Sequence, residues 1–146
     1  MFIFYLTYHA RILSMEFGRQ RSSEGNTPLE LLICSEEFKT ELYRGLLILG
    51  KKNVRKEYRH LWSEKHPYFG YCYVVTELLY HLSDKRVTPK VIPTDEGKHW
   101  YVELSNGEPL DLAKDQEYDY STGVKRSFMT QTMSARTKQL KEIMGL

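Results

Sequence analysis

The residue types that acyl transfer requires occur in one order along this chain: Cys72, then His99, then Asp111. A cysteine thiolate attacks carbonyl carbon, and a histidine can take the thiol proton and later return it to the leaving group. A carboxylate bonded to the imidazole holds the ring in one tautomer. The three residues therefore predict a thiol-hydrolase site with Cys72 as nucleophile, His99 as base and Asp111 as the group that orients the base.

The segment around Cys72 predicts the start of a buried helix. Gly70, two residues upstream, permits a sharp turn that leaves the sulfur accessible. The apolar residues that follow recur at helical spacing: Val74, Val75, Leu78, Leu79 and Leu82. A helix N-terminus favours a thiolate, and its free N–H groups can stabilise an oxyanion. The alternative is an inert cysteine on a structural helix.

His99 and Asp111 lie on either side of a predicted β-hairpin. Residues 99–104 alternate in polarity, and Asn106-Gly107 is a strong turn signal. Asp111 stands between two leucines, and burying a carboxylate without a partner is costly. His99 is therefore its expected partner. The alternative is a histidine at the strand edge that bonds only to backbone.

The hairpin must meet a geometric condition. A two-residue turn at Asn106-Gly107 would pair Asp111 with Val102 and place it on the face opposite His99. A bulge at Gly107 shifts the register by one residue and brings Asp111 to the face of His99. The catalytic hypothesis therefore predicts a bulged hairpin.

Helix and strand signals predict the elements that position these residues. Ser35 and Gly50 are suited to the two ends of a helix. The predicted helices are 36–49, 51–62, 72–82 and one from about Ser134 to Met144, and the predicted strands are 89–92, 99–104 and 109–113. This set predicts an α+β fold, with helices packed on a small antiparallel sheet in a single domain over residues 29–146.

The predicted helix 51–62 carries a basic face, made of Lys51, Lys52, Arg55, Lys56 and Arg59. This face is either simply solvated or binds phosphate or an acidic partner. A zinc site is not expected, because no Cys-x-x-Cys or His-x-x-x-His pair is present. There is also no nucleotide-binding fingerprint, so we expect neither a metal nor a cofactor.

The composition is that of a globular chain, with 146 residues of which 41% are hydrophobic and 27% charged. A net charge of +2 is too small to indicate a nucleic-acid partner. Two cysteines cannot form a disulfide framework. We expect unpaired thiols, a buried Cys34 and a cytoplasmic protein.

Residues 1–28 are predicted to be a flexible segment outside the domain. The apolar run from Met1 to Leu6 is too short to cross a membrane, which takes roughly 20 apolar residues. No membrane association is therefore expected. Either translation starts at Met15 and residues 1–14 are an upstream extension, or residues 1–14 hold a genuine terminal strand.

Several short motifs resemble the YunG-like family of uncharacterised bacterial and phage proteins. They are Trp62-Ser63, Pro67-Tyr-Phe-Gly70-Tyr-Cys72, His99-Trp-Tyr-Val, Asn106-Gly-Glu-Pro-Leu-Asp111-Leu and Arg126-Ser-Phe-Met. The resemblance covers about residues 60–144. The order Cys, His, Asp is also similar to that of papain-like and transglutaminase-like enzymes. No glutamine of the papain type precedes Cys72.

The resemblance implies a papain-like or transglutaminase-like core and catalytic roles for the three residues of the site. It also implies that Gln116 lies near them. The other residues expected to line the cleft or contact substrate are Gly70, Tyr71, His66 and Trp100.

Two functional hypotheses follow. The first is a cysteine hydrolase or acyl transferase that acts on an amide, isopeptide or thioester bond of a protein or peptide-like substrate. The second is a non-catalytic accessory protein on the same scaffold that binds through Lys52, Arg55 and Arg59. The sequence does not indicate an oligomeric state.

Overall fold

The computed structural model describes residues 25–146, so the predicted flexible segment up to residue 24 and the alternative start at Met15 lie outside the described residues. The α-helices are α2 (Pro28–Ile33), α3 (Glu36–Leu49), α4 (Cys72–Leu82) and α5 (Ala135–Ile143), and the 3-10 helices are η2 (Lys51–Asn53), η3 (Lys56–Leu61) and η4 (Tyr120–Thr122). The strands are β1 (Thr88–Thr94), β2 (Gly97–Glu103), β3 (Pro109–Leu110) and β4 (Val124–Lys125), and they form an antiparallel sheet in the order β3-β2-β1-β4. The fold is α+β, with helices and a small antiparallel sheet.

Capping side chains define the first two helices. Ser35 Oγ accepts a hydrogen bond from the Phe38 N–H at the start of α3, and Gly50 ends that helix with a φ of 76°. The predicted helix 36–49 is confirmed. Helix α2 was not predicted, although Thr27 and Glu30 form a capping box at its start.

The predicted helix 51–62 is wrong. The chain instead forms η2 and η3, separated by Val54, which has extended dihedral angles and is buried in the core. The Arg59 side chain donates hydrogen bonds to the backbone oxygens of Val54 and Lys52, which holds this looped path in place. Because there is no continuous helix, the basic residues do not share one helical face.

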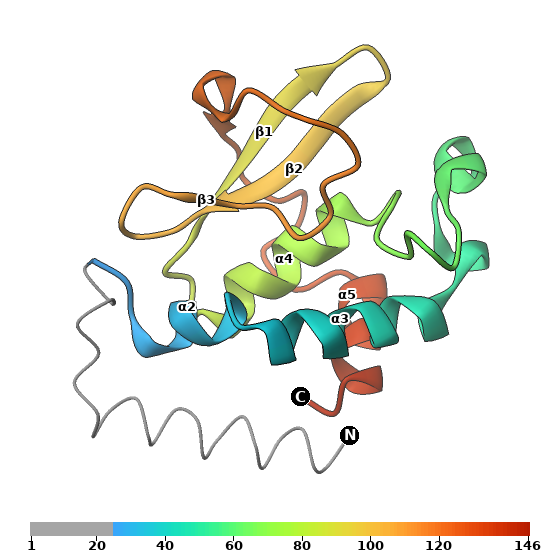
Figure 1. The fold of residues 1–146 in the computed structure, drawn as a ribbon, viewed down its shortest axis with the longest axis horizontal. Coiled ribbons are helices and arrows are strands. Elements are labelled where there is room, and N and C mark those ends of the chain that lie inside the picture. The colour runs from blue at the N-terminus through green and yellow to red at the C-terminus, as the bar shows by residue number, and fades with distance from the viewer. Residues whose placement is uncertain (1–24) are drawn as a thin grey trace.

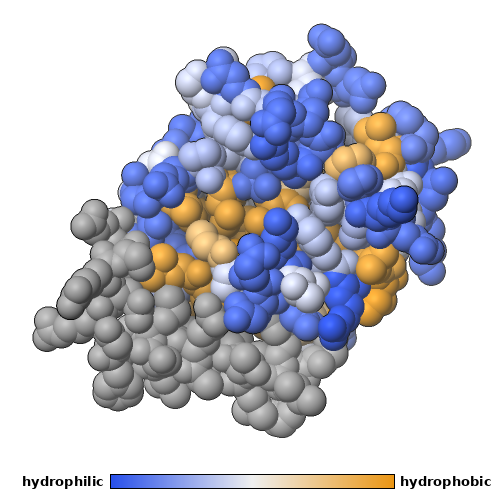
Figure 2. All heavy atoms as spheres, in the orientation of Figure 1, coloured by the Kyte–Doolittle hydropathy of each residue, from blue (hydrophilic) through white to orange (hydrophobic). Residues whose placement is uncertain are grey.

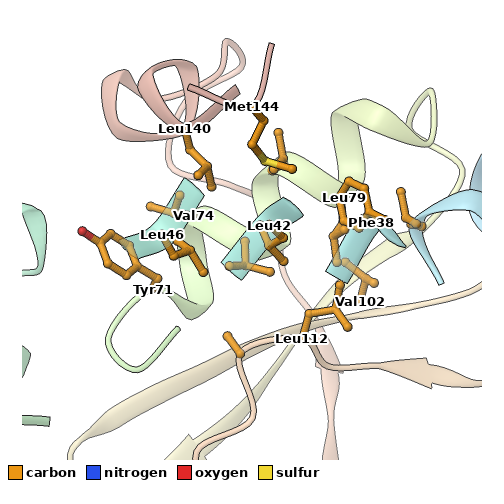
Figure 3. Packing of buried hydrophobic residues seen from close by; sticks show 14 of the residues in the cluster. Phe38, Leu42, Leu46, Tyr71, Val74, Leu79, Val102, Leu112, Leu140 and Met144 are labelled. Atoms are coloured by element: carbon orange, nitrogen blue, oxygen red, sulfur yellow. The ribbon is translucent and has the colours of Figure 1, made fainter. Parts of the chain in front are cut away.

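Helix α4 lies between the sheet and the other long helices (Figure 1). The β-sheet packs on one side of it and α3 with α5 on the other, so its apolar residues are covered on both sides. Side chains from α3, α4, α5 and β2 meet in one core (Figure 3). Among the fully buried members are Leu42, Leu46, Val74, Leu78, Val102 and Leu140. Cys72, at the first position of α4, is thereby fixed against β2.

Polar residues cover most of the described surface on the face in Figure 2, with apolar patches between them. Within residues 25–146 no helix is long and apolar enough to cross a membrane. The expectation that Cys34 is buried is wrong: α2 ends at Ile33, and Cys34 follows it as an exposed cap residue.

Candidate active site

The hairpin that joins β2 to β3 has the shifted register that the catalytic hypothesis requires. Val102 pairs with Leu110, and the Leu104 N–H donates to the Glu108 oxygen at 2.8 Å. The Gly107 N–H donates to the Leu104 oxygen at 2.9 Å, and Gly107 has a φ of 90°. This is a tight turn followed by a glycine bulge. The predicted bulge is confirmed.

The bulge brings His99 and Asp111 into contact. His99 lies on β2 and Asp111 directly follows β3, which is shorter than the predicted 109–113. The distance from His99 Nε2 to Asp111 Oδ2 is 2.7 Å, and only 3% and 4% of the two side chains are exposed. The Tyr120 hydroxyl donates to the same oxygen at 2.8 Å. Asp111 Oδ1 is buried and has no hydrogen-bond partner among the described residues.

Cys72 occupies the other side of the imidazole. It is half-buried at the start of α4, and its side chain and charge act on His99. Because Nε2 is bonded to Asp111, Nδ1 is the ring nitrogen left available to the sulfur. A sulfur, an imidazole and a carboxylate are thus joined in sequence.

The electrostatics of this chain of groups favour a charged imidazole. Burial lowers the pKa of His99, but the hydrogen bonds to Asp111 and Cys72, together with the charges of both, outweigh it and raise the pKa to about 9. His99 is therefore protonated at neutral pH, and an adjacent cation favours the thiolate form of a cysteine.

Tyr118 covers one face of the imidazole. Its ring is stacked on that of His99, with the centroids 4.0 Å apart, and its hydroxyl donates to Asp115. The segment after β3 that carries Tyr118 crosses over β2 (Figure 1). The stack shields the imidazole from solvent on that side.

A cleft of about 920 Å³ opens onto Cys72 and His99. Three further residues expected at the cleft do line it, namely Gly70, Trp100 and Gln116. Two expectations are wrong. Tyr71 is fully buried and donates its hydroxyl to the Gly50 oxygen, because it shares the inner face of α4. His66 is exposed, stacks on Phe69 and is not part of the lining.

The first turn of α4 offers backbone donors to the cleft. The Val75 N–H is the first that bonds back into the helix, to the Tyr71 oxygen at 2.9 Å. No side-chain hydrogen bond caps this N-terminus. The N–H groups of Cys72 and its neighbours are therefore suited to bind a developing oxyanion.

The second thiol has the opposite environment. Partial burial of the sulfur raises the pKa of the Cys34 thiol, and the negative charges of Glu30 and Glu108 raise it further. Together they bring this pKa to about 11. Among residues 25–146, no histidine charge acts on this thiol. We expect Cys34 to react slowly, and Cys34→Ala removes it from measurements on Cys72.

Sequence reasoning missed three residues that the structure brings to the site. Tyr120 bonds to Asp111, while Arg55 and Arg136 line the cleft beside Cys72. The sequence places Arg55 only on the basic face of a predicted helix. No local pattern marks Arg136, because its place at the cleft depends on how α5 packs against α4.

The chain was compared with protein-family models, with curated proteins and with solved structures, and none of them matches.

Proposed function

We propose that this protein is a cysteine hydrolase or acyl transferase that acts on an amide, isopeptide or thioester bond through Cys72, His99 and Asp111. The observation that carries the proposal is the imidazole of His99, which bonds to Asp111 and interacts with Cys72 at an open cleft. A buried, oriented imidazole beside an accessible thiol is the arrangement that nucleophilic catalysis requires.

We further propose that the core is papain-like or transglutaminase-like, as the YunG-like resemblance implies. A cysteine at the start of a helix packed on an antiparallel strand that carries the histidine supports this assignment. The carboxylate comes directly after the next strand, so the chain order Cys, His, Asp fits as well.

In the acylation step the Cys72 thiolate attacks the substrate carbonyl carbon and forms a tetrahedral intermediate. The backbone N–H groups at the start of α4 stabilise its oxyanion. The intermediate collapses as the bond to the leaving group breaks, and the leaving nitrogen or sulfur takes the proton from His99 Nδ1. The products of this step are the free leaving group and an acyl thioester on Cys72.

In the second step a water molecule or an acceptor amine attacks the thioester. His99, now neutral, accepts a proton from the attacking group, and the bond to the Cys72 sulfur breaks. The thiolate and the imidazolium are restored. Asp111 holds the ring throughout through the hydrogen bond between its Oδ2 and His99 Nε2. The Tyr120 hydroxyl donates to the same oxygen and so keeps the carboxylate in place. Water gives hydrolysis and an amine gives acyl transfer.

The test is the pH dependence of Cys72 alkylation by iodoacetamide. Cys34→Ala supplies the background for all variants. We expect alkylation at pH 6 to remain within a few-fold of its rate at pH 8, whereas His99→Ala loses most of the rate at pH 6. A thiolate held by an imidazolium reacts below the pH at which an ordinary thiol ionises, about 8.5.

The two hypotheses differ in this measurement. Slow alkylation at pH 6 that is indifferent to His99→Ala would overturn the catalytic proposal and favour the non-catalytic binding protein. Fast, His99-dependent alkylation justifies a screen of amide, isopeptide and thioester substrates by release of the leaving group.

A further inference from the structure

Two arginines line the same cleft as Cys72. Arg136 comes from the first turn of α5, and Arg55 from the residue that precedes η3; both line the cleft together with Cys72. Arg136 Nη1 donates a hydrogen bond to the Asn53 oxygen at 3.2 Å. This bond ties the end of the Arg136 side chain to the segment that carries Arg55.

The two guanidinium groups are close enough to repel each other. Burial lowers the pKa of Arg136, the charge of Arg55 lowers it further, and the charge of Cys72 raises it. The charges of both arginines also act on Tyr73, which lines the same cleft. Guanidinium groups remain protonated in proteins. The cleft lining also contains Lys98 and Arg126, but Arg136 is the cation on which the charges of both Arg55 and the proposed nucleophile act.

Within residues 25–146 neither arginine forms an ion pair with a carboxylate. Glu77 acts electrostatically on Arg136, but its Oε1 accepts hydrogen bonds from the Ser134 backbone and hydroxyl, and its Oε2 has no hydrogen bond in that part of the chain. The acidic residues of the cleft lining are Asp95, Glu96 and Asp115, and none of them pairs with either arginine. Within the described residues the charges of Cys72 and Glu77 act on Arg136, but no carboxylate forms an ion pair with either guanidinium.

We propose that Arg55 and Arg136 bind an anionic group of the substrate, a carboxylate or a phosphate, next to the bond that Cys72 attacks. The inference rests on the proposed function and adds to it a substrate class: acyl compounds that carry a negative charge close to the reacting carbonyl. The guanidinium fork matches the paired oxygens of both anions. An anion between the two arginines also removes their mutual repulsion.

Two alkylating reagents separate this inference from the proposed function. Iodoacetamide and iodoacetate both alkylate a cysteine through the same displacement of iodide, but only iodoacetate carries a carboxylate. The iodoacetamide rate reports the nucleophile. The ratio of the iodoacetate rate to the iodoacetamide rate reports the anion site, and it can be measured whether alkylation is fast or slow.

We expect Arg136→Gln and Arg55→Gln each to lower this ratio several-fold, and the double variant to lower it roughly tenfold or more. The His99 imidazolium also attracts iodoacetate, so the decisive quantity is the change of the ratio on replacing the arginines. Arg86→Gln is the matched control: it removes an exposed guanidinium outside the cleft and leaves the ratio unchanged. Arg136→Lys retains the charge at the α5 site and keeps most of the ratio.

If the ratio of the iodoacetate rate to the iodoacetamide rate is equal in wild type and in the double variant, the inference is wrong. The proposed function is judged separately, because rapid, His99-dependent labelling by iodoacetamide would still support the nucleophile. Competition then identifies the anion. At constant ionic strength, protection of Cys72 by succinate points to a carboxylate and protection by inorganic phosphate points to a phosphate. If neither succinate nor inorganic phosphate protects Cys72 at any concentration that leaves the protein folded, this result also counts against the anion site.

Discussion

The phenol ring of Tyr118 lies parallel to the imidazole of His99, with the ring planes 6° apart and the centroids 4.0 Å apart. Hydrogen bonds fix an imidazole within its own plane, and a stacked ring prevents it from tilting out of that plane. The bonds to Asp111 and Cys72 supply the first constraint, and Tyr118 supplies the second. The imidazole is thereby held between its two partners.

The stacking predicts that the ring of Tyr118 matters more than its hydroxyl. We expect Tyr118→Leu to lower the alkylation rate of Cys72 at pH 6 by roughly three- to tenfold and stability by about 1 kcal/mol, the usual worth of an aromatic pair. Tyr118→Phe keeps the ring and is expected to stay close to wild type. Stopped-flow alkylation and urea unfolding measure both effects. Equal losses in Tyr118→Phe and Tyr118→Leu would assign the role to the hydrogen bond with Asp115 instead.

The raised pKa of His99 predicts that stability falls as the solution becomes alkaline. In the unfolded chain the pKa returns to about 6.5, whereas in the folded protein it is about 9. The stabilisation by the imidazolium is therefore complete below pH 6.5 and is lost as the pH rises through 9. At about 1.4 kcal/mol per unit of pKa shift, the loss is on the order of 3 kcal/mol.

Urea unfolding between pH 6 and 9.5 measures this dependence. His99→Gln lacks the titrating group and should show a flatter profile than wild type. Asp111→Asn should lower the pKa of His99, seen by NMR of the ring carbons, because it removes the charge that raises this pKa and leaves only a neutral acceptor for the hydrogen bond. Asp84→Asn is the control, since Asp84 is exposed and does not act on His99. A His99 pKa that does not move in Asp111→Asn contradicts the account.

The positive φ of Gly107 sets the register of the β2–β3 hairpin and, through it, the position of Asp111 in the site. At a φ of 90° a β-branched residue is strained by about 1–3 kcal/mol, while asparagine tolerates this region better. Among the described residues other than its two chain neighbours, no atom lies within 4 Å of a Cβ built at Gly107, so we attribute any effect to the backbone. We expect Gly107→Val to lower stability and to slow alkylation of Cys72, and Gly107→Asn to do so much less. If the two variants behave alike, the bulge does not position Asp111.

The parts of the fold that the sequence predicts well are those set by local rules. Ser35 and Gly50 mark the ends of α3 by capping, and the apolar stripe after Cys72 gives the bounds of α4. The bulge at Gly107 could be inferred because only one register brings His99 and Asp111 together. Each of these inferences needs only neighbouring residues and backbone geometry.

The predictions that fail depend on packing between distant segments. The stretch from Lys51 to Leu61 has helical polarity, but burial of Val54 and the bonds from Arg59 to backbone oxygens break it into two short turns. Tyr120 reaches Asp111 only because the segment after β3 folds back over β2. Arg136 reaches the cleft only because α5 packs on α4.

Gly70 predicts a link between core packing and the reactivity of Cys72. Its φ is 84°, and a Cβ at this position would lie 2.6 Å from Val54 Cγ1, which is buried. Gly70→Ala therefore meets both backbone strain and a clash with the core. We expect a loss of about 1–3 kcal/mol in the free energy of unfolding, and slower alkylation because the loop before α4 must shift Cys72.

A double-mutant cycle separates the two causes in Gly70→Ala. Val54→Ala alone is destabilising because it leaves a cavity, but it also removes the atom that the added methyl group would meet. If the clash dominates, Gly70→Ala costs less stability in the Val54→Ala background than in wild type, and the rate of Cys72 alkylation is partly restored. If strain at the positive φ dominates, the two losses add and alkylation stays slow. A Gly70→Ala protein with wild-type stability and wild-type alkylation would show that the loop adapts without moving the sulfur.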